Sequence, residues 1–209
     1  MNKVNKLILF DWGNIVESHS TGFSNRDAWD KLFRECGYID EDQVFEKLGK
    51  YRLSTLRDIN EFENTFNQMK EDFNLNKSYD EFINIYNNVF SKIDYYPEVA
   101  EYEHSLKDKC YIGILSDLTI FDKDRLDKQV NLSEYDYLFL SFELGMKKPE
   151  DNIYDYVMNN VPFEPSDILF IDDRSNNIET AKRKGWNTLH ITGLELDKIK
   201  EECEKFINN

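Results

Sequence analysis

Three short apolar runs in the sequence each end in residues that could take part in catalysis. Leu-Ile-Leu-Phe leads to Asp11, Tyr-Ile-Gly-Ile-Leu leads to Ser116 and Asp117, and Ile-Leu-Phe-Ile leads to Asp172 and Asp173. A carboxylate at the end of a buried strand can attack a substrate as a nucleophile or hold a metal ion. A serine hydroxyl can donate a hydrogen bond to a phosphate oxygen. These residues predict a site that combines carboxylates with a hydrogen-bond donor.

A fourth segment, Gly-Met-Lys-Lys-Pro-Glu, contains Lys148. We expect this lysine to neutralise an anionic nucleophile and a phosphoryl group in transfer, because a preorganised cation stabilises the charge that develops in a reaction. The carboxylates of Asp11, Asp172 and Asp173 are hard oxygen ligands of the kind that Mg²⁺ prefers. The sequence has no cluster of cysteines and histidines that would favour zinc. Mg²⁺ is therefore the expected cofactor.

The apolar runs recur along the chain and are typical of strands buried on both faces of a parallel sheet. They cover residues 7–10, 110–115, 137–140, 168–171 and 188–191. Segments with helical periodicity separate the later runs, which predicts an α/β fold with a Rossmann-like parallel sheet flanked by helices. Because the carboxyl ends of parallel strands share one edge, residues more than 150 positions apart in the sequence can meet there.

Residues 20–95 differ, because they contain no clear strand run. Aromatic residues recur there at helical spacing, which predicts an all-helical insertion of about four helices. We expect these aromatic side chains to pack in the core of the insertion rather than to bind a ligand. Examples are Phe62, Phe66, Phe73, Phe82 and Phe90.

The composition limits the classes of partner. The chain has 209 residues and a formal net charge of -15, which disfavours binding to the phosphate backbone of nucleic acids. Its three cysteines lie far apart, as is typical of reduced thiols in a cytoplasmic protein. The first residues do not look like a signal peptide, and no apolar stretch approaches membrane-spanning length. We expect a cytoplasmic protein that acts on a small molecule; the sequence does not indicate its oligomeric state.

In this order and spacing, the four segments resemble the four motifs of the haloacid dehalogenase-like (HAD) hydrolase superfamily. Gly-Met-Lys-Lys-Pro-Glu-Asp-Asn-Ile-Tyr and Phe-Ile-Asp-Asp-Arg-Ser-Asn-Asn-Ile are similar to the phosphatase branch that includes a bacterial sugar-1-phosphate phosphatase. The resemblance implies an α/β core domain at residues 1–19 and 95–209. The insertion at residues 20–94 sits where this family has its helical C1-type cap over the active site.

The resemblance also implies a metal site. Asp11 would attack phosphorus to form an aspartyl-phosphate and would contact Mg²⁺. The backbone carbonyl of Gly13 would contact the same ion. Asp172 and Asp173 would hold it directly or through water, and Asn177 would support them.

Three residues would form the phosphate site that the resemblance implies: Ser116, Asp117 and Lys148. Ser116 would hold the phosphate, and Lys148 would orient both the phosphate and Asp11. Asp117 departs from the family pattern, which often has asparagine at this position. Its carboxylate adds negative charge near the phosphate unless the side chain turns away and only its N–H is used.

Gly13 is the second departure. Phosphatases of this family usually place a second aspartate there, which protonates the leaving group and later activates water. Losing such a group typically costs about 10²–10⁴ in rate. Glu17 or His19, just beyond the loop, could substitute, or the leaving group could depart unaided.

The leading hypothesis is a Mg²⁺-dependent phosphatase that hydrolyses a small soluble phosphomonoester. The glycine at position 13 motivates an alternative, a non-catalytic or weakly active phosphate-ligand-binding protein on the same scaffold. A 2-haloacid dehalogenase is a third hypothesis, since those relatives also lack the second aspartate. They need no Mg²⁺, however, and usually lack the pair Asp172 and Asp173.

Overall fold

The computed structural model describes residues 3–17, 22–40, 44–193 and 195–209. Within them, five strands form a parallel sheet in the order β3-β2-β1-β4-β5. The strands are β1 Leu7–Phe10, β2 Tyr111–Ser116, β3 Tyr137–Leu140, β4 Ile168–Asp172 and β5 Asn187–His190. The prediction of an α/β fold with a parallel sheet is confirmed, because every predicted strand is present with its ends displaced by no more than one residue.

The register of the sheet explains why distant residues meet. β1 lies at the centre and pairs with β2 on one side and with β4 on the other. Phe10 is opposite Ile171 of β4, so the next residues, Asp11 and Asp172, lie level at the carboxyl edge. Ser116 is the last residue of β2 and reaches the same edge. The catalytic candidates are thus brought together by strand pairing.

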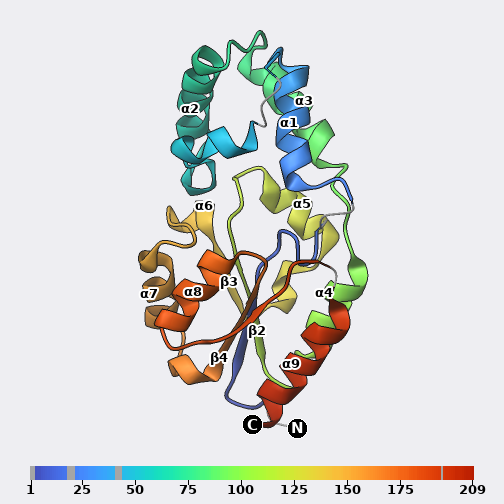
Figure 1. Ribbon diagram of the computed structural model, residues 1–209, viewed down its shortest axis with the longest axis vertical. Helices are drawn as coiled ribbons and strands as arrows, with labels where there is room; N and C mark the ends of the chain where they lie inside the picture. Colours follow the sequence, from blue (N-terminus) through green and yellow to red (C-terminus); the bar gives the residue numbers. More distant parts are fainter. Residues whose placement is uncertain (1–2, 18–21, 41–43, 194) are drawn as a thin grey trace.

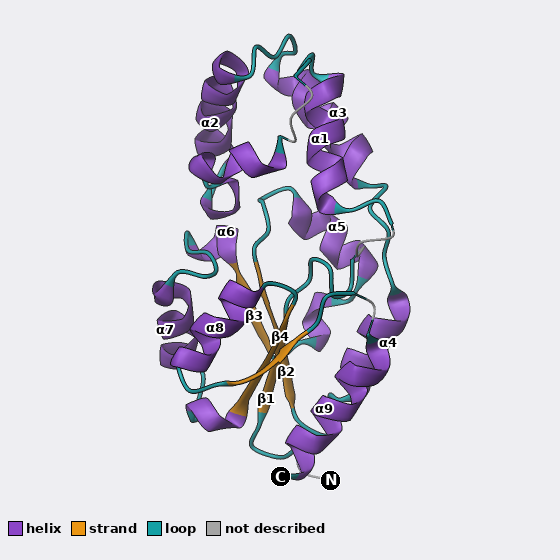
Figure 2. Ribbon diagram, viewed as in Figure 1, coloured by secondary structure: helices purple, strands orange, loops and turns teal. Residues whose placement is uncertain are grey.

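Helices cover both faces of the sheet (Figures 1 and 2). Successive residues of a strand point to opposite faces. Accordingly, Ile8 and Phe10 pack in a cluster with residues of α4, α5 and α9, whereas Leu7 and Leu9 pack with residues of α7 and α8. The helices of this part are α4 Pro97–Ser105, α5 Asp122–Gln129, α6 Ser141–Leu144, α7 Asp151–Asn160, α8 Ser175–Arg183 and α9 Leu196–Asn208.

The insertion is helical and has a hydrophobic cluster of its own. It comprises α1 Asn25–Glu35, the 3₁₀ turns η1 Phe45–Tyr51 and η2 Leu53–Thr55, α2 Ile59–Asp72 and α3 Tyr79–Phe90. Ser24 and Ser78 begin α1 and α3 with reciprocal capping hydrogen bonds, which satisfy backbone N–H groups of the first turn. In Figure 1 these helices lie beyond the carboxyl ends of the strands.

Among the described residues the insertion has three α-helices and two 3₁₀ turns, where the sequence predicted about four helices. Gly49 lies within η1, and the left-handed backbone of Arg52 separates η1 from η2, so no regular helix forms there. The expected boundary near residue 19 is outside the described residues, and the domain limits stay a prediction. Every described helix is too short or too polar to span a bilayer.

A buried carboxyl group lies in the core away from the sheet edge. Glu103 on α4 is completely buried, and its Oε2 accepts a hydrogen bond of 2.6 Å from the hydroxyl of Tyr135. Burial raises the pKa of Glu103 to about 8, although the hydrogen bond from Tyr135 acts in the opposite direction. The folded protein therefore keeps this group protonated over a pH range in which the unfolded chain has lost the proton.

This titration predicts a pH-dependent stability. Protonated Glu103 contributes to the stability of the folded protein below pH 4.5, the pKa of this group in the unfolded chain. This contribution is lost as the pH rises to about 8, its pKa in the folded protein. Glu103→Gln keeps an acceptor for Tyr135 but cannot ionise. The difference in free energy of unfolding between Glu103→Gln and wild type should increase by about 3 kcal/mol, in favour of the variant, from about pH 5.5 to about pH 8.5. Urea unfolding followed by circular dichroism measures this difference.

The matched control is Glu101→Gln, which changes an exposed glutamate on the same helix. It should leave the pH dependence of stability as in wild type. Parallel pH profiles for Glu103→Gln and wild type would contradict the assignment.

Candidate active site

Asp11 stands one residue beyond β1 and is nearly buried, with 7% exposure. Its N–H donates to the carbonyl of Ile171 at 2.9 Å, which continues the pairing of β1 with β4. Three donors bind Oδ1 of Asp11: the N–H of Trp12 at 2.7 Å, Oγ of Ser116 at 2.6 Å and Nζ of Lys148 at 2.9 Å. Oδ2 accepts no hydrogen bond from the described residues. One carboxylate oxygen is therefore held and the other stays available.

Lys148 lies between two carboxylates. Its Nζ is 2.9 Å from Oδ1 of Asp11 and 2.6 Å from Oδ2 of Asp172, and the side chain is buried. Burial acts to lower the pKa of Lys148, but Asp11, Asp172 and Asp117 outweigh it and hold the pKa above its ordinary value. The lysine therefore remains positively charged beside the candidate nucleophile.

Asp172 ends β4 and is completely buried. The side-chain amide of Asn177 donates to both of its oxygens, at 2.9 and 3.0 Å, and the N–H of Arg174 donates to Oδ1 at 2.8 Å. Burial raises the pKa of Asp172 to about 6; Lys148 opposes the shift and Asp11 adds to it. Asn177, which we expected to support Asp172 and Asp173, thus contacts Asp172, and its role at a metal site stays a prediction.

Asp173 is positioned by a residue that the sequence analysis missed. Nδ2 of Asn14 donates to Oδ2 of Asp173 at 2.9 Å, and Asn14 adopts a left-handed backbone with φ of 60°. Asparagine tolerates a left-handed backbone better than most residues. Its presence at position 14 was the only sign of this conformation in the sequence. Burial raises the pKa of Asp173, and the nearby Asp11 carboxylate adds to the shift.

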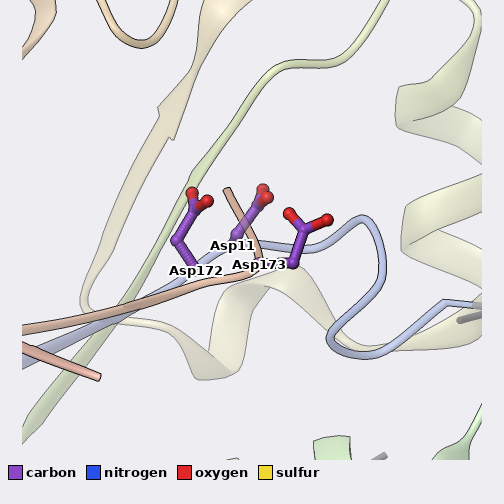
Figure 3. A group of neighbouring side chains, drawn as sticks. All are labelled: Asp11, Asp172 and Asp173. Carbon is purple, nitrogen blue, oxygen red and sulfur yellow. The ribbon is translucent and has the colours of Figure 1, made fainter. Parts of the chain in front are cut away.

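The three aspartates form a group suited to a metal ion. One oxygen each from Asp11, Asp172 and Asp173 lies within 4.8 Å of the others. Figure 3 shows the three carboxylates rising side by side from neighbouring strand ends. Mg²⁺ prefers such oxygen ligands, and its charge would offset the repulsion and burial that raise the pKa values of Asp172 and Asp173. The residues present therefore fit the cofactor that the sequence predicted.

Two further candidates lie beside this group. Asp117 turns its side chain to the backbone, where Oδ1 accepts the N–H of Lys148 at 3.0 Å. Burial raises the pKa of Asp117, while Lys148 lowers it. At Gly13, a Cβ atom would meet nothing within 4 Å, and the backbone is not left-handed. A side chain would therefore fit at position 13.

Glu17 does not join the carboxylate group. Its side chain is buried and forms an ion pair with the guanidinium of Arg125 on α5. This pairing gives Glu17 a structural partner and leaves it a poor candidate for proton transfer at Asp11. His19, the other residue considered for that role, lies outside the described residues.

A family model described as "Haloacid dehalogenase-like hydrolase" matches residues 26–191. The chain belongs to this family. The prediction of an enzyme is therefore confirmed at the level of a HAD-family hydrolase.

Two relatives come from Bacteroides thetaiotaomicron. A D-ribitol-5-phosphate phosphatase is 25% identical over 201 residues, covering 88% of this chain and 90% of its own. A HAD-family enzyme solved with magnesium and inorganic phosphate has 19% identity and a TM-score of 0.72, covering 91% of this chain and 96% of that one. An L-2-haloacid dehalogenase from Xanthobacter autotrophicus is more distant, with 13% identity and a TM-score of 0.62, covering 97% and 83%.

The fit to Mg²⁺ predicts a thermal shift. A metal that binds only the folded state stabilises it by about 2.7 kcal/mol at a hundredfold excess over Kd, or about 5–10 °C in Tm for a chain of this size. Asp173→Asn should remove most of this shift. Without Mg²⁺ the variant should be at least as stable as wild type, because it loses a crowded carboxylate. Differential scanning fluorimetry with and without MgCl₂ tests both points.

Asp151→Asn is the matched control, since its side chain is 61% exposed. It should show the full Mg²⁺-dependent shift. A shift that survives in Asp173→Asn would place the metal elsewhere.

Proposed function

We propose that this HAD hydrolase is a Mg²⁺-dependent phosphatase that acts on a small soluble phosphomonoester in the cytoplasm. The observation that carries the proposal is the position of Lys148, which pairs with Asp11 inside the group of metal-compatible carboxylates. An anionic substrate can approach such an acidic group only where local cations offset its charge. Lys148 supplies one such cation, and Mg²⁺ would supply the other.

Asp11 is the proposed nucleophile. One of its carboxylate oxygens attacks phosphorus, the bond from phosphorus to the ester oxygen breaks, and the alcohol leaves with the electron pair and takes a proton from water. A second water then hydrolyses the aspartyl-phosphate and regenerates the carboxylate. The three donors to Oδ1 hold the side chain in one orientation for this attack.

The neighbouring residues have distinct proposed roles. Lys148 stabilises the charge of the phosphoryl group, and the hydroxyl of Ser116 can turn from Asp11 to a phosphate oxygen. Asp117 holds the backbone of Lys148 in place and offers its own N–H to the phosphate. No step requires the Asp117 carboxylate to face the substrate.

Mg²⁺ would be held by Asp11, Asp172 and Asp173 together with the carbonyl of Gly13. When bound, it would neutralise part of the charge of the phosphate and of the carboxylates. Asn177 would keep Asp172 oriented toward this ion, since it donates to both carboxylate oxygens.

The helical insertion is the proposed cap, by which we mean α1–α3 together with η1 and η2. It reaches the carboxyl edge of the sheet: η2 contacts α6, and Arg52 pairs with Glu150 two residues after Lys148. A cap at this edge would select the substrate. The similarity to a D-ribitol-5-phosphate phosphatase makes phosphorylated polyols and sugars the first class to test.

The nucleophile assignment predicts the effect of Asp11→Asn. This change keeps the size of the side chain but removes the attacking charge, so phosphate release should fall about a thousandfold or more. The measurement is inorganic phosphate released from a panel of sugar and polyol phosphates with MgCl₂. Asp155→Asn, on an exposed side chain, should leave the rate unchanged.

Other results would favour the alternatives. Tight binding of phosphate esters without any turnover would indicate a non-catalytic binding protein. Halide release from 2-haloacids in the absence of metal would indicate a dehalogenase.

The space at Gly13 predicts a gain of activity. Gly13→Asp would place a proton donor beside the leaving group, and kcat for an alkyl phosphate should rise about 10–100-fold. The rate for p-nitrophenyl phosphate should change much less, because its leaving group departs without a proton. Gly13→Asn is the matched control, since it fills the same space without transferring a proton. Equal rates for the two variants would show that proton transfer at this position does not limit turnover.

A further inference from the structure

A buried polar network joins the cap to the core at a distance from the carboxylate group. Its centre is Asp122, the first residue of α5. The carboxylate of Asp122 accepts two hydrogen bonds from Thr119, one from its N–H at 2.7 Å and one from its hydroxyl Oγ1 at 2.9 Å. It accepts a third from Nη2 of Arg125 at 2.8 Å. It also accepts the hydroxyl of Tyr86 at 3.1 Å, from α3 of the cap. Tyr86 and Asp122 are both almost completely buried.

Arg125 extends this network to the connections between core and cap. Its guanidinium pairs with Glu17 as well as with Asp122. Glu17 forms a backbone bridge with Tyr95, and the N–H of Tyr96 donates to the carbonyl of Val16 at 2.9 Å. The chain enters and leaves the cap through these two segments. Arg125 of α5 therefore holds the first segment directly, and the second segment is joined to the first by backbone contacts.

The loop that follows β2 connects the network to the proposed phosphate site. It begins at Asp117, beside Ser116, and its Leu118 exchanges hydrogen bonds of 2.9 and 3.1 Å with Ser141 of the core. Phe121 then packs edge-on against Phe62 of the cap, with ring centroids 4.7 Å apart. One end of this loop thus carries the phosphate-binding residues, and the other end is held by the cap.

The opposite side of the cap is attached differently. Figure 1 shows α5 below α3 on one side and α6 facing the 3₁₀ turns on the other. On the α6 side, Arg52 pairs with Glu150, and these side chains are 45% and 32% exposed. Exposed ion pairs contribute little to stability, whereas a buried charge that loses its partners is strongly destabilising. The exposed Arg52–Glu150 pair therefore contributes less to the attachment of the cap than the buried network does, although η2 also packs against α6 on this side.

We propose that Asp122 and Arg125 are positioning residues that fix the cap to the loop carrying Ser116 and Asp117. The kinetic part of this proposal rests on the phosphatase function proposed above. The structural part does not, so the two can fail separately.

Hydrogen exchange with mass spectrometry tests the structural part. Arg125→Met keeps the apolar stem but loses both ion pairs, and it should speed exchange about tenfold in segments 15–17, 95–96 and 117–122. Arg125→Lys should restore most of the protection. Arg52→Gln is the control for the other side, and it should speed exchange only near residues 52–56 and 145–150.

Steady-state kinetics test the positioning role. With a sugar phosphate that the wild type hydrolyses, Arg125→Met should raise KM about tenfold and change kcat less than about threefold. Tyr86→Phe, which keeps the ring and loses only the hydroxyl, should shift KM in the same direction if Arg125→Met does not fold.

Unchanged exchange in segments 95–96 and 117–122 of folded Arg125→Met would overturn the proposal. So would a larger effect of Arg52→Gln on those segments. Absence of phosphatase activity in the wild type would remove the proposed function, but the exchange result would still decide the positioning role.

Discussion

The buried contact of Lys148 with Asp11 and Asp172 is the constraint on which the rest of the site depends. A lysine without exposure is tolerated only when anionic partners replace the water that it has lost. Those partners come from the ends of β1 and β4, which are adjacent and parallel. The sheet register therefore has to be correct before the charge can be buried. The position of this one side chain therefore depends on the correct pairing of β1 with β4.

The same arrangement leaves the site with excess negative charge. Asp173 and Asp172 both have raised pKa values, for which burial is the main cause and the carboxylate of Asp11 a further one. A divalent cation would offset this excess negative charge, and a phosphate group could then bind between the cation and Lys148. In the proposed function, the site would therefore bind an anion despite the net charge of -15 on the whole chain.

The strands, and the meeting of Asp11, Ser116 and Asp172 at one sheet edge, were predictable because each of these residues directly follows an apolar run. Asp11, Ser116 and Asp172 needed no knowledge of partners, since a parallel sheet brings its strand ends together. Two other contacts were not predictable. Asn14 contacts Asp173 across 159 positions, and Arg125 binds Glu17 across 108, which no local pattern encodes. The structure therefore changed the interpretation of Glu17 from a possible proton donor to one half of a buried ion pair.

The energetics of the buried charges bear on whether this scaffold retains a function. Lys148 and Asp172 would be replaced at little loss, or with gain, by apolar residues of similar volume if stability alone mattered. The chain instead keeps Lys148 in contact with Asp11 and Asp172, and Asn177 in contact with Asp172. Asp173 lies close to the other two carboxylates. Charged side chains that are costly to bury, and yet are held in one orientation by hydrogen bonds, are typical of sites that bind a charged ligand. In the proposed mechanism Gly13 supplies no proton donor, but the contacts that orient Asp11 are present. The proposed phosphatase would therefore lack assistance only in proton transfer, which a reactive leaving group does not need.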